Sequence, residues 1–342
     1  MPTDRSADID RFLAEAGWSG ATRRLLADDA SFRRYERVER DGKQAVLMDA
    51  PPEKEDVRPF VTVAQLLRSL GLSAPEILAT DEVNGYLLLE DLGDDTYTRV
   101  LARGGDEYEI YGLATDTLIR LQRDFRPAEQ VPDYTRDLLA KEADLLIDWY
   151  WPAVKGAPCP EPDRAVFRGL WRNALDHAFA VPSSLVLRDY HVDNLIHLPD
   201  REAEAACGLL DFQDAVIGPV TYDLVSLFED ARRDVPHALA NGLMRRYLNA
   251  FPAMPRDAFA LSYAVLGVQR ATKIIGIFTR LDRRDGKPRY LHHIPRTWRW
   301  LEGGLNHPLL RDLKEWYDMN FPPSLRRAPA GSDEAKEAVA RQ

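Results

Sequence analysis

The chain changes its pattern near residue 93, and this change constrains the fold more than any other feature. The first ninety residues hold β-prone runs that turn at Asp41-Gly42 and Asn84-Gly85, dipeptides typical of hairpins. One helix, whose apolar residues Phe60, Val63, Leu67 and Leu70 keep a 3.6-residue period, interrupts these runs. Long amphipathic helices follow. We therefore predict an α+β fold with a small antiparallel β lobe, one inserted helix and a larger, mainly helical lobe.

The same pattern predicts the domain boundaries. Residues 1–92, which open with a short helix, form the small lobe, and residues 93–322 form the larger one. A single β-like island, residues 184–212, interrupts the helices of the larger lobe. Residues 323–342 are rich in Pro, Ala and charge and are expected to form a flexible tail.

Composition excludes several classes of protein. With 342 residues, a net charge of -10 and a pI near 5.3, the chain is globular and unsuited to general nucleic-acid binding. Its two cysteines, Cys159 and Cys207, have neither zinc-ligand nor CxxC spacing. The N-terminal residues lack the apolar region of a signal peptide, and no run is long enough to span a membrane. We expect a cytoplasmic protein, while its oligomeric state stays open.

The β-like island carries the residues that best define a chemistry. One apolar strand runs into LRDYHVDN (residues 187–194), and a second apolar strand ends at Asp211. The Asp189 carboxylate can orient and deprotonate a hydroxyl. The amide oxygen of Asn194 and the Asp211 carboxylate are hard ligands that suit Mg²⁺. Because phosphoryl transfer from ATP needs these parts, we predict a catalytic base and two metal ligands gathered at the mouth of one hairpin.

These residues resemble the catalytic loop HGDxHxxN of the aminoglycoside phosphotransferase and choline kinase superfamily, whose fold is similar to that of protein kinases. The chain matches the Asp, the inner His and the Asn of that loop at Asp189, His191 and Asn194. A Tyr-Asp-Leu at residues 222–224 matches a further family feature. The resemblance implies a two-lobed protein-kinase-like fold, a structural role for His191, and a buried anchoring role for Asp223.

The resemblance also implies how the small lobe covers ATP. The strand and hinge YLLLEDLG, residues 86–93, would present backbone groups to adenine. The turn near residue 31 takes the place of the nucleotide-covering loop and offers guanidinium groups for phosphate oxygens. The residues expected to contact the nucleotide are Ser31, Arg33, Arg34, the carbonyl of Glu90 and the amide of Leu92.

The small lobe departs from the family at one position. Met48 stands where relatives usually place a lysine against the phosphates, and the following helix has no Glu to pair with such a lysine. Either Arg33, Arg34 or Lys54 takes the place of that lysine, or the nucleotide binds weakly.

Across residues 8–322 the chain looks like the bacterial anomeric kinases that phosphorylate N-acetylmuramate and N-acetylglucosamine at the C1 hydroxyl in cell-wall recycling. The resemblance rests on sequence segments such as DASFRRYERV, LVLRDYHVDNL and QRATKIIGIFTRL. The missing lysine also fits these anomeric kinases. An anomeric hydroxyl is more acidic than an ordinary alcohol, so a single Asp base suffices. The residues expected to contact the sugar are Asp214, Glu229, Asp230, Arg270 and Lys273, where Arg and Lys suit the lactyl carboxylate of N-acetylmuramate.

Three other functions stay open. A kinase of the same fold can act on an aminoglycoside, an amino alcohol or another sugar, and the acidic net charge suits a cationic substrate. A pseudokinase that only binds or scaffolds is consistent with Met48. A metal-dependent hydrolase could use Asp189, His191 and Asp193, although zinc sites usually recruit further His or Cys ligands.

Overall fold

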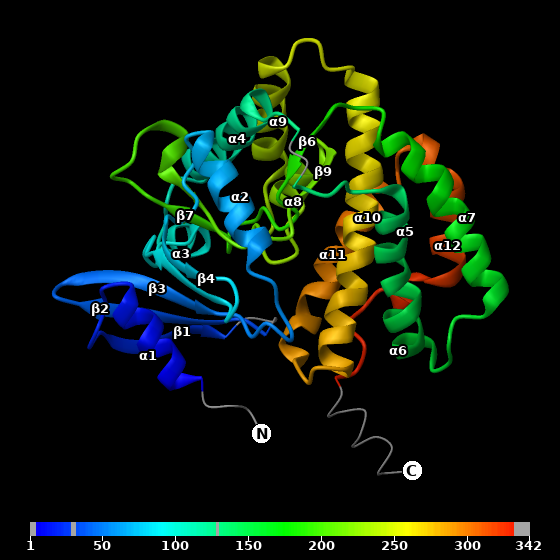
Figure 1. Ribbon diagram of the computed structural model, residues 1–342. Coiled ribbons are helices and arrows are strands. Elements are labelled where there is room, and N and C mark those ends of the chain that lie inside the picture. Colours follow the sequence, from blue (N-terminus) through cyan, green and yellow to red (C-terminus); the bar gives the residue numbers. More distant parts are fainter. Residues whose placement is uncertain (1–4, 29–31, 128–129, 332–342) are drawn as a thin grey trace. The chain divides into compact units, whose positions relative to one another are not determined.

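The structure is a computed structural model, and it describes residues 5–28, 32–127 and 130–331 (Figure 1). The contacts divide the chain into two compact units. Unit 1 consists of Met1–Val131 and Val192–Ala215, and unit 2 consists of Pro132–His191 and Val216–Gln342. The lobe boundary expected after residue 92 remains a prediction.

Unit 1 contains an antiparallel sheet of five strands in the order β1-β2-β3-β5-β4. Both predicted hairpins are present. Asp41 and Gly42 have φ values of 51° and 73°, so the first hairpin turns through two left-handed residues, a conformation that Asp and Gly tolerate. The edge strand β1 was not predicted, because its sequence TRRLLAD does not alternate cleanly. The strands are β1 Thr22–Asp28, β2 Arg34–Arg40, β3 Lys43–Asp49, β4 Ile77–Asp81 and β5 Tyr86–Glu90.

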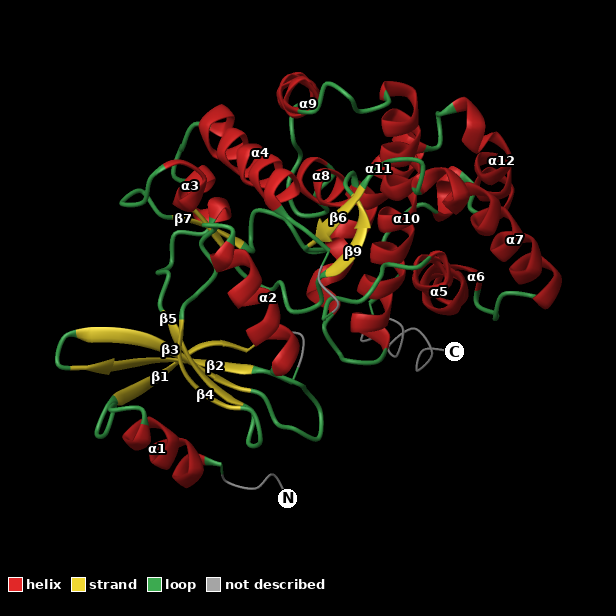
Figure 2. Cartoon of the chain, turned by 45° about the horizontal axis from the view of Figure 1, so that its top comes forward, coloured by secondary structure: helices red, strands yellow, loops and turns green. Residues whose placement is uncertain are grey.

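The two faces of this sheet have different neighbours because successive side chains of a strand point to opposite sides. On one face, Ala45 and Leu47 of β3 pack in a buried cluster with Phe12 of helix α1, Ser6–Glu15 (Figure 2). The alternate residue Val46 lines a cavity together with Phe60 of helix α2, Arg58–Ser69. The sheet therefore has a structural face and a cavity face.

The rest of unit 1 consists of two helices and a short hairpin that is joined to the loops beside the large sheet. Leu209 N donates to Ser73 O at 2.8 Å, and Thr98 N donates to Val192 O at 3.2 Å. These bonds explain why residues 192–215 belong to unit 1 although they follow much later in the chain. The elements are α3 Tyr97–Ala102, α4 Glu107–Asp124, β7 Leu195–His197, the 3₁₀ turn Ala203–Ala206 and β8 Cys207–Leu209.

Unit 2 is built around helix α10, Arg256–Arg283, which packs against α5, α7, α8 and α11 (Figure 1). Its residues 265–276 are buried, so this helix is apolar or internally paired on nearly every side. The other elements are α5 Arg136–Leu145, the π turn Leu146–Tyr150, α6 Trp151–Lys155, α7 Glu161–Ala178, β6 Ser183–Val186, β9 Val216–Pro219, α8 Tyr222–Phe228, α9 His237–Ala250, the 3₁₀ turn Pro288–His293, α11 Ile294–Gly304, the 3₁₀ turn Pro308–Leu310, α12 Arg311–Asn320 and the 3₁₀ turn Pro323–Leu325.

The single hairpin predicted for residues 184–212 is wrong. Strand β6 pairs with β9, whereas β7 pairs with β8, which gives two separate two-stranded sheets. The polar loop between β6 and β7 contains Arg188 with φ 70°, a left-handed conformation that turns the backbone. The two apolar strands predicted from the sequence therefore pair with different strands, the first in unit 2 and the second in unit 1.

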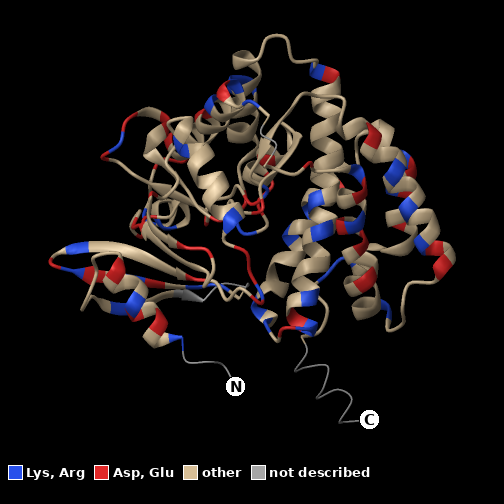
Figure 3. Ribbon diagram, viewed as in Figure 1, with Lys and Arg blue, Asp and Glu red and all other residues tan. Residues whose placement is uncertain are grey.

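Ion pairs join helix α7 to residues 144 and 148. Figure 3 shows acidic positions near both ends of α7 and basic positions between them, where Arg164 pairs with Asp148 at 2.6 Å and Arg168 pairs with Asp144 at 2.8 Å. Within the part of the chain that the structure describes, no helix has both the length and the apolar character of a membrane span.

The chain after α12 is anchored as far as it is described. Arg326 pairs with Glu302 at 2.6 Å, and Tyr150 OH donates to the Arg327 carbonyl at 2.8 Å. The flexible tail expected for residues 323–342 remains a prediction, and residues 332–342 lie outside the described part.

Candidate active site

A cavity of about 570 Å³ lies within unit 1. Its apolar wall comes from the cavity face of the sheet and from α2, through residues that include Val46, Leu89 and Phe60. Its polar wall includes Asn194 and Asp211, which flank the β7–β8 hairpin. A cavity with a flat apolar wall and a small polar end suits a ligand with an aromatic ring and a charged tail.

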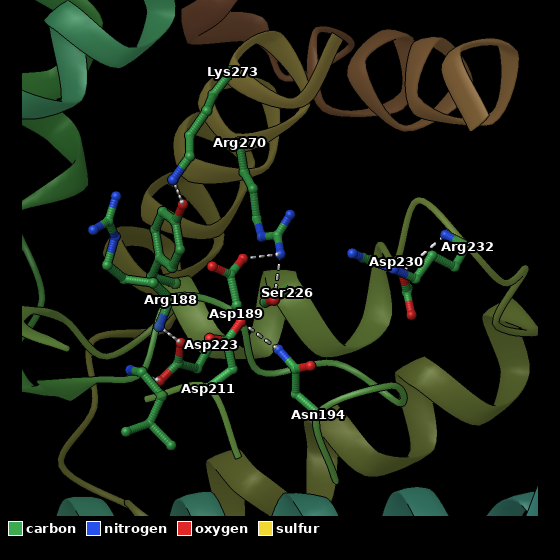
Figure 4. A network of polar contacts seen from close by, with 12 residues as sticks. Arg188, Asp189, Asn194, Asp211, Asp223, Ser226, Asp230, Arg232, Arg270 and Lys273 are labelled. Atoms are coloured by element: carbon green, nitrogen blue, oxygen red, sulfur yellow. Dashed lines mark hydrogen bonds and ion pairs between the residues drawn. The ribbon is translucent and has the colours of Figure 1, made fainter. Parts of the chain in front are cut away.

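At the polar end, Asn194 and Asp211 lie together. Asn194 Nδ2 donates to Asp211 Oδ2 at 3.4 Å (Figure 4), and Gln213 Nε2 donates to Asp211 Oδ1 at 2.8 Å. The Asn194 carbonyl accepts a bond from Leu210 N at 2.9 Å, which ties the two chain segments together. Asp211 has φ 58°, a conformation that costs energy for a residue with a Cβ and is frequent at functional sites.

The donor set of this pair fits a small hard cation. Carboxylate and amide oxygens are the ligands that Mg²⁺ prefers, and Mg²⁺ bound with nucleotides needs only one or two protein ligands. A site built from three or more His, Cys, Asp or Glu side chains is absent from the described residues. Asn194 and Asp211 therefore fit Mg²⁺ shared with phosphate groups.

Arg33 lies beside this pair. Its side chain is only 9% exposed, with one terminal nitrogen 3.7 Å from Asp211 Oδ1 and its Nε 3.8 Å from Glu55 Oε2. Arg34, by contrast, is 56% exposed and pairs with Glu36 at 3.2 Å. Of the three residues expected from the nucleotide-covering turn, Ser31 lies outside the described residues.

The expected hinge lines the same cavity, from Glu90 through Leu92 to Asp94. The Glu90 carboxylate pairs with Arg201 and with Arg68, at 3.6 Å from the latter, so this side chain is engaged by two cations. Arg37 binds both Asp91 and Asp94, and these hydrogen bonds, that of Asp94 first, raise the pKa of Arg37 above its ordinary value. This ion cluster fixes the hinge.

Asp189 belongs to unit 2 and faces helix α10. One terminal nitrogen of Arg270 donates to Ser226 Oγ at 2.7 Å and lies 3.5 Å from Asp189 Oδ1 (Figure 4). Burial by itself would raise the pKa of the Asp189 carboxyl, but the positive charges of Lys273 and Arg270 outweigh burial and lower that pKa to about 2. The side chain is still 47% exposed, so an ionised carboxylate is open to a ligand.

A buried network lies next to Asp189. Glu142 of α5 accepts bonds from Arg188 and Tyr134, and Lys273 Nζ lies 3.3 Å from it and 3.4 Å from Tyr222 OH. Burial opposes ionisation of Glu142, but Lys273 and then Arg188 lower its pKa below the usual value. The network contains two cationic side chains, Arg188 and Lys273, and one carboxylate, Glu142. A net positive charge therefore remains near Asp189.

Asp223 binds the backbone at the start of the loop, and His191 is buried within the loop. Asp223 is 1% exposed and accepts the backbone N–H groups of Leu187 at 2.7 Å and Arg188 at 2.9 Å. Burial raises the pKa of Asp223 to about 7, although these two bonds oppose the rise. His191 is 3% exposed, and its burial lowers the pKa of the imidazole well below its usual range. His191 is therefore neutral at physiological pH.

A second cavity, of about 450 Å³, lies within unit 2 between α9, α10 and α11. Glu229, Tyr263 and Trp300 line it, and the Trp300 indole donates to the Asp230 carbonyl at 3.1 Å. The Oε2 atom of Glu229 is buried and has no hydrogen-bond partner among the described residues. Burial raises the pKa of Glu229 to about 8, so this carboxyl is neutral near pH 7.

The residues expected to contact a sugar occupy different environments. Asp230 is 1% exposed and accepts a bond from Arg232 N at 2.9 Å. Arg270 and Lys273 are both buried within the contacts described above. Asp214 is exposed, belongs to unit 1, and accepts a bond from Gln213 at 3.4 Å. Glu229 alone among them lines the second cavity.

Sequence reasoning missed three acidic or phenolic residues at these places: Glu55, Glu142 and Tyr263. Glu55 precedes α2 by three residues, so a search for an acidic partner inside that helix passes over it. Glu142 has no local signal, because an acidic residue on an amphipathic helix usually faces water. Only the tertiary contacts single these residues out.

Comparison with known proteins agrees with this geometry. A family profile described as "Phosphotransferase enzyme family" (APH) matches residues 22–259. Among solved structures, the choline kinase LicA from Streptococcus pneumoniae is similar with a TM-score of 0.62 at 14% identity, covering 89% of this chain and all of that one. An ADP-bound aminoglycoside phosphotransferase, APH(2'')-Ib, gives a TM-score of 0.58 at 14% identity, covering 91% and 99%. These likenesses confirm the two-lobed protein-kinase-like fold.

Two curated relatives are much more similar in sequence. An N-acetylmuramate/N-acetylglucosamine kinase of Caulobacter vibrioides is 35% identical over 96% of this chain and 99% of its own length. A protein of the same name from Pseudomonas aeruginosa is 40% identical over 89% of this chain and 90% of its own length. The resemblance read from the catalytic loop is thereby confirmed, and the chain belongs to the phosphotransferase enzyme family.

Proposed function

We propose that this protein is an ATP-dependent sugar kinase that phosphorylates the anomeric hydroxyl of N-acetylmuramate or N-acetylglucosamine, a reaction of cell-wall recycling. The observation that carries the proposal is the identity of 34–40% to four kinases with this name, over 84–99% of their lengths. The geometry of each unit supports a separate part of the reaction.

Unit 1 would bind the nucleotide. The adenine ring would lie against the apolar wall near Val46 and Leu89, with its edge read by the Glu90 carbonyl and the Leu92 amide. Asn194 and Asp211 would hold Mg²⁺. When bound, that ion supplies positive charge to the transferred phosphoryl group.

Asp189 would act on the acceptor. Because its pKa is held at about 2, it is ionised at any physiological pH and accepts the hydrogen bond of a sugar hydroxyl. So weak a base removes a proton only as the hydroxyl becomes acidic during transfer, and the acidity of an anomeric hydroxyl makes this easier. Asp189 and Asn194 are five residues apart on one loop, which limits the distance between their Cα atoms to about 17 Å.

The second cavity would take the body of the sugar. It begins near Glu229, three residues after Ser226, which shares Arg270 with Asp189. Aromatic side chains suit the apolar faces of a sugar ring, and a neutral carboxyl suits hydroxyl and acetamido groups. A cationic acceptor such as an aminoglycoside would instead favour an ionised carboxylate at this place.

The decisive experiment uses the purified chain with ATP, Mg²⁺ and N-acetylmuramate or N-acetylglucosamine. Phosphorus NMR of the product is expected to show a sugar 1-phosphate, identified by its coupling to the anomeric proton. Phosphorylation at another hydroxyl, or turnover of aminoglycosides or amino alcohols alone, would overturn the acceptor assignment. Binding of Mg·ATP without turnover of any acceptor would instead indicate a pseudokinase.

A further inference from the structure

The cavity face of β3 supplies no positive charge for a polyphosphate. Its central residues, Val46 and Met48, are apolar, and Met48 is 1% exposed between neighbouring strands. A nucleoside triphosphate nevertheless brings several negative charges to the polar end of the cavity. A single divalent ion neutralises only part of that charge, so a protein cation is needed near Asp211.

Arg33 is placed to be that cation. It immediately precedes β2, and its guanidinium stands between two carboxylates, Glu55 at 3.8 Å and Asp211 at 3.7 Å. The Phe32 amide donates to the other oxygen of Glu55 at 3.2 Å, so Glu55 is itself fixed to the chain beside Arg33. With 9% of its side chain exposed, Arg33 is held in a partly dry environment where a charge acts strongly.

The neighbouring cations are directed elsewhere. Arg34 is 56% exposed and pairs with Glu36 on its own strand. Lys54 Nζ lies 5.4 Å from the centre of the Phe32 ring. Arg99, which also lines the cavity, is 61% exposed and lies 3.7 Å from Asp94, at the hinge.

We propose that Arg33 is the phosphate-binding cation of this kinase and that it exchanges partners when the nucleotide arrives. Without nucleotide, Arg33 neutralises the Asp211 carboxylate. With Mg·ATP bound, Asp211 turns to the metal ion and the guanidinium donates to phosphate oxygens, while Glu55 holds it in position. The inference rests on the nucleotide half of the proposed function and is independent of the acceptor.

The distances fit such an exchange. Separations of 3.7 and 3.8 Å are ion-pair contacts, longer than the hydrogen bonds that lock a guanidinium in one place. A phosphate oxygen at hydrogen-bond distance would therefore lie closer to the guanidinium than Asp211 does. The planar fork of an arginine binds such oxygens in pairs, which the ammonium group of a lysine cannot do.

The test measures equilibrium binding by calorimetry with no sugar present, using Mg·ATP and adenosine as probes. Arg33→Gln is expected to weaken Mg·ATP binding by roughly 10- to 100-fold, the usual cost of losing hydrogen bonds to a charged group, and to change adenosine binding less than about threefold. Arg33→Lys should recover part of the loss. Arg58→Gln is the matched control, because Arg58 is 72% exposed and pairs with Asp56 near Glu55.

Glu55→Gln tests whether Glu55 positions Arg33 and does not contact the nucleotide itself. It is expected to weaken Mg·ATP binding by roughly 3- to 10-fold, and adding it to Arg33→Gln should cause no further loss, because Glu55 acts through Arg33. Unchanged Mg·ATP binding in Arg33→Gln would overturn the proposal, as would an equal loss of adenosine binding or a larger loss in Arg34→Gln. Should the protein bind Mg·ATP through Arg33 yet phosphorylate no sugar, the acceptor assignment would fail and this inference would stand.

Discussion

Asp211 of unit 1 and Glu142 of unit 2 are held in opposite ways. In unit 1, Asp211 lines a cavity and accepts a bond from Gln213 at 2.8 Å, while Asn194 and Arg33 lie farther away, at 3.4 Å and 3.7 Å. In unit 2, Glu142 is buried among Arg188, Lys273 and Tyr134. Loose contacts at a cavity can be exchanged for a ligand, whereas a buried network is costly to disturb. The comparison suggests that unit 1 adapts to the nucleotide while unit 2 holds the electrostatic environment of Asp189 constant.

The largest expected effect is that of Asp189→Asn. The variant should lower kcat by about two to four powers of ten, because an amide cannot accept the hydroxyl proton. Mg·ATP binding should stay within about threefold of wild type, since Asp189 belongs to unit 2 and not to the unit proposed to bind the nucleotide. Steady-state kinetics together with calorimetry check this. Wild-type turnover in the variant would refute the role of Asp189.

Asp211→Asn should weaken nucleotide binding by unit 1. Mg·ADP binding is expected to weaken by about 100-fold, because an amide is a poor ligand for Mg²⁺, while adenosine binding is retained. Asp95→Asn is the control, since Asp95 pairs with exposed Arg103 at 2.7 Å in the same unit. If Mg·ADP bound equally well to both variants, Asp211 would not be a metal ligand.

Glu142→Gln should disrupt the buried network of unit 2 and lower the free energy of unfolding by about 3 kcal/mol. The reason is that Arg188 and Lys273 would lose their shared carboxylate in the interior. Urea unfolding measures the change. Asp144→Asn, two residues along the same helix, removes a partner of half-exposed Arg168 and should cost less than about 1 kcal/mol. Equal losses in the two variants would mean that the network is no more than a surface ion pair.

The smallest expected effect concerns Glu229 and depends on pH. Burial raises the pKa of its carboxyl from 4.5 to about 8, so the folded state binds a proton that the unfolded state releases. This contribution to stability is complete below pH 4.5 and is lost as the pH rises to about 8.

Glu229→Gln keeps the shape and removes the titration. The variant should therefore gain stability over wild type as the pH rises from 5 to 7, by about 2.5 kcal/mol. Urea unfolding at several pH values tests this. A difference between variant and wild type that does not change with pH would contradict the assignment of a neutral buried carboxyl.

Much of the fold was predictable because it depends on local pattern. The Asp41-Gly42 turn, the helix that ends before Gly71 and the periodic helices around Leu118 and Trp171 all appear as expected. The pairing of the strands around the catalytic loop was not predictable. Periodicity identifies a strand but does not name its partner, and β6 and β7 pair with strands that follow later in the chain.

The residues of the candidate site also fall into two groups: those that the sequence singled out and those whose environment only the structure revealed. The spacing of Asp189, Asn194 and Asp211 was enough to single them out, because hard oxygen ligands and a base are what phosphoryl transfer requires. The environments of Arg270 and Lys273 were not evident, since charged helical residues usually face solvent and these two are buried.

The amino-acid sequence by itself determined the class of chemistry and the family, because both depend on which side chains follow one another along a few short segments. Only the tertiary structure decided which charges are paired, which carboxyl groups are ionised, and that Glu55 and Asp211 share Arg33. The physical reason is that an electrostatic interaction depends on distance and burial through space, and separation along the chain fixes neither.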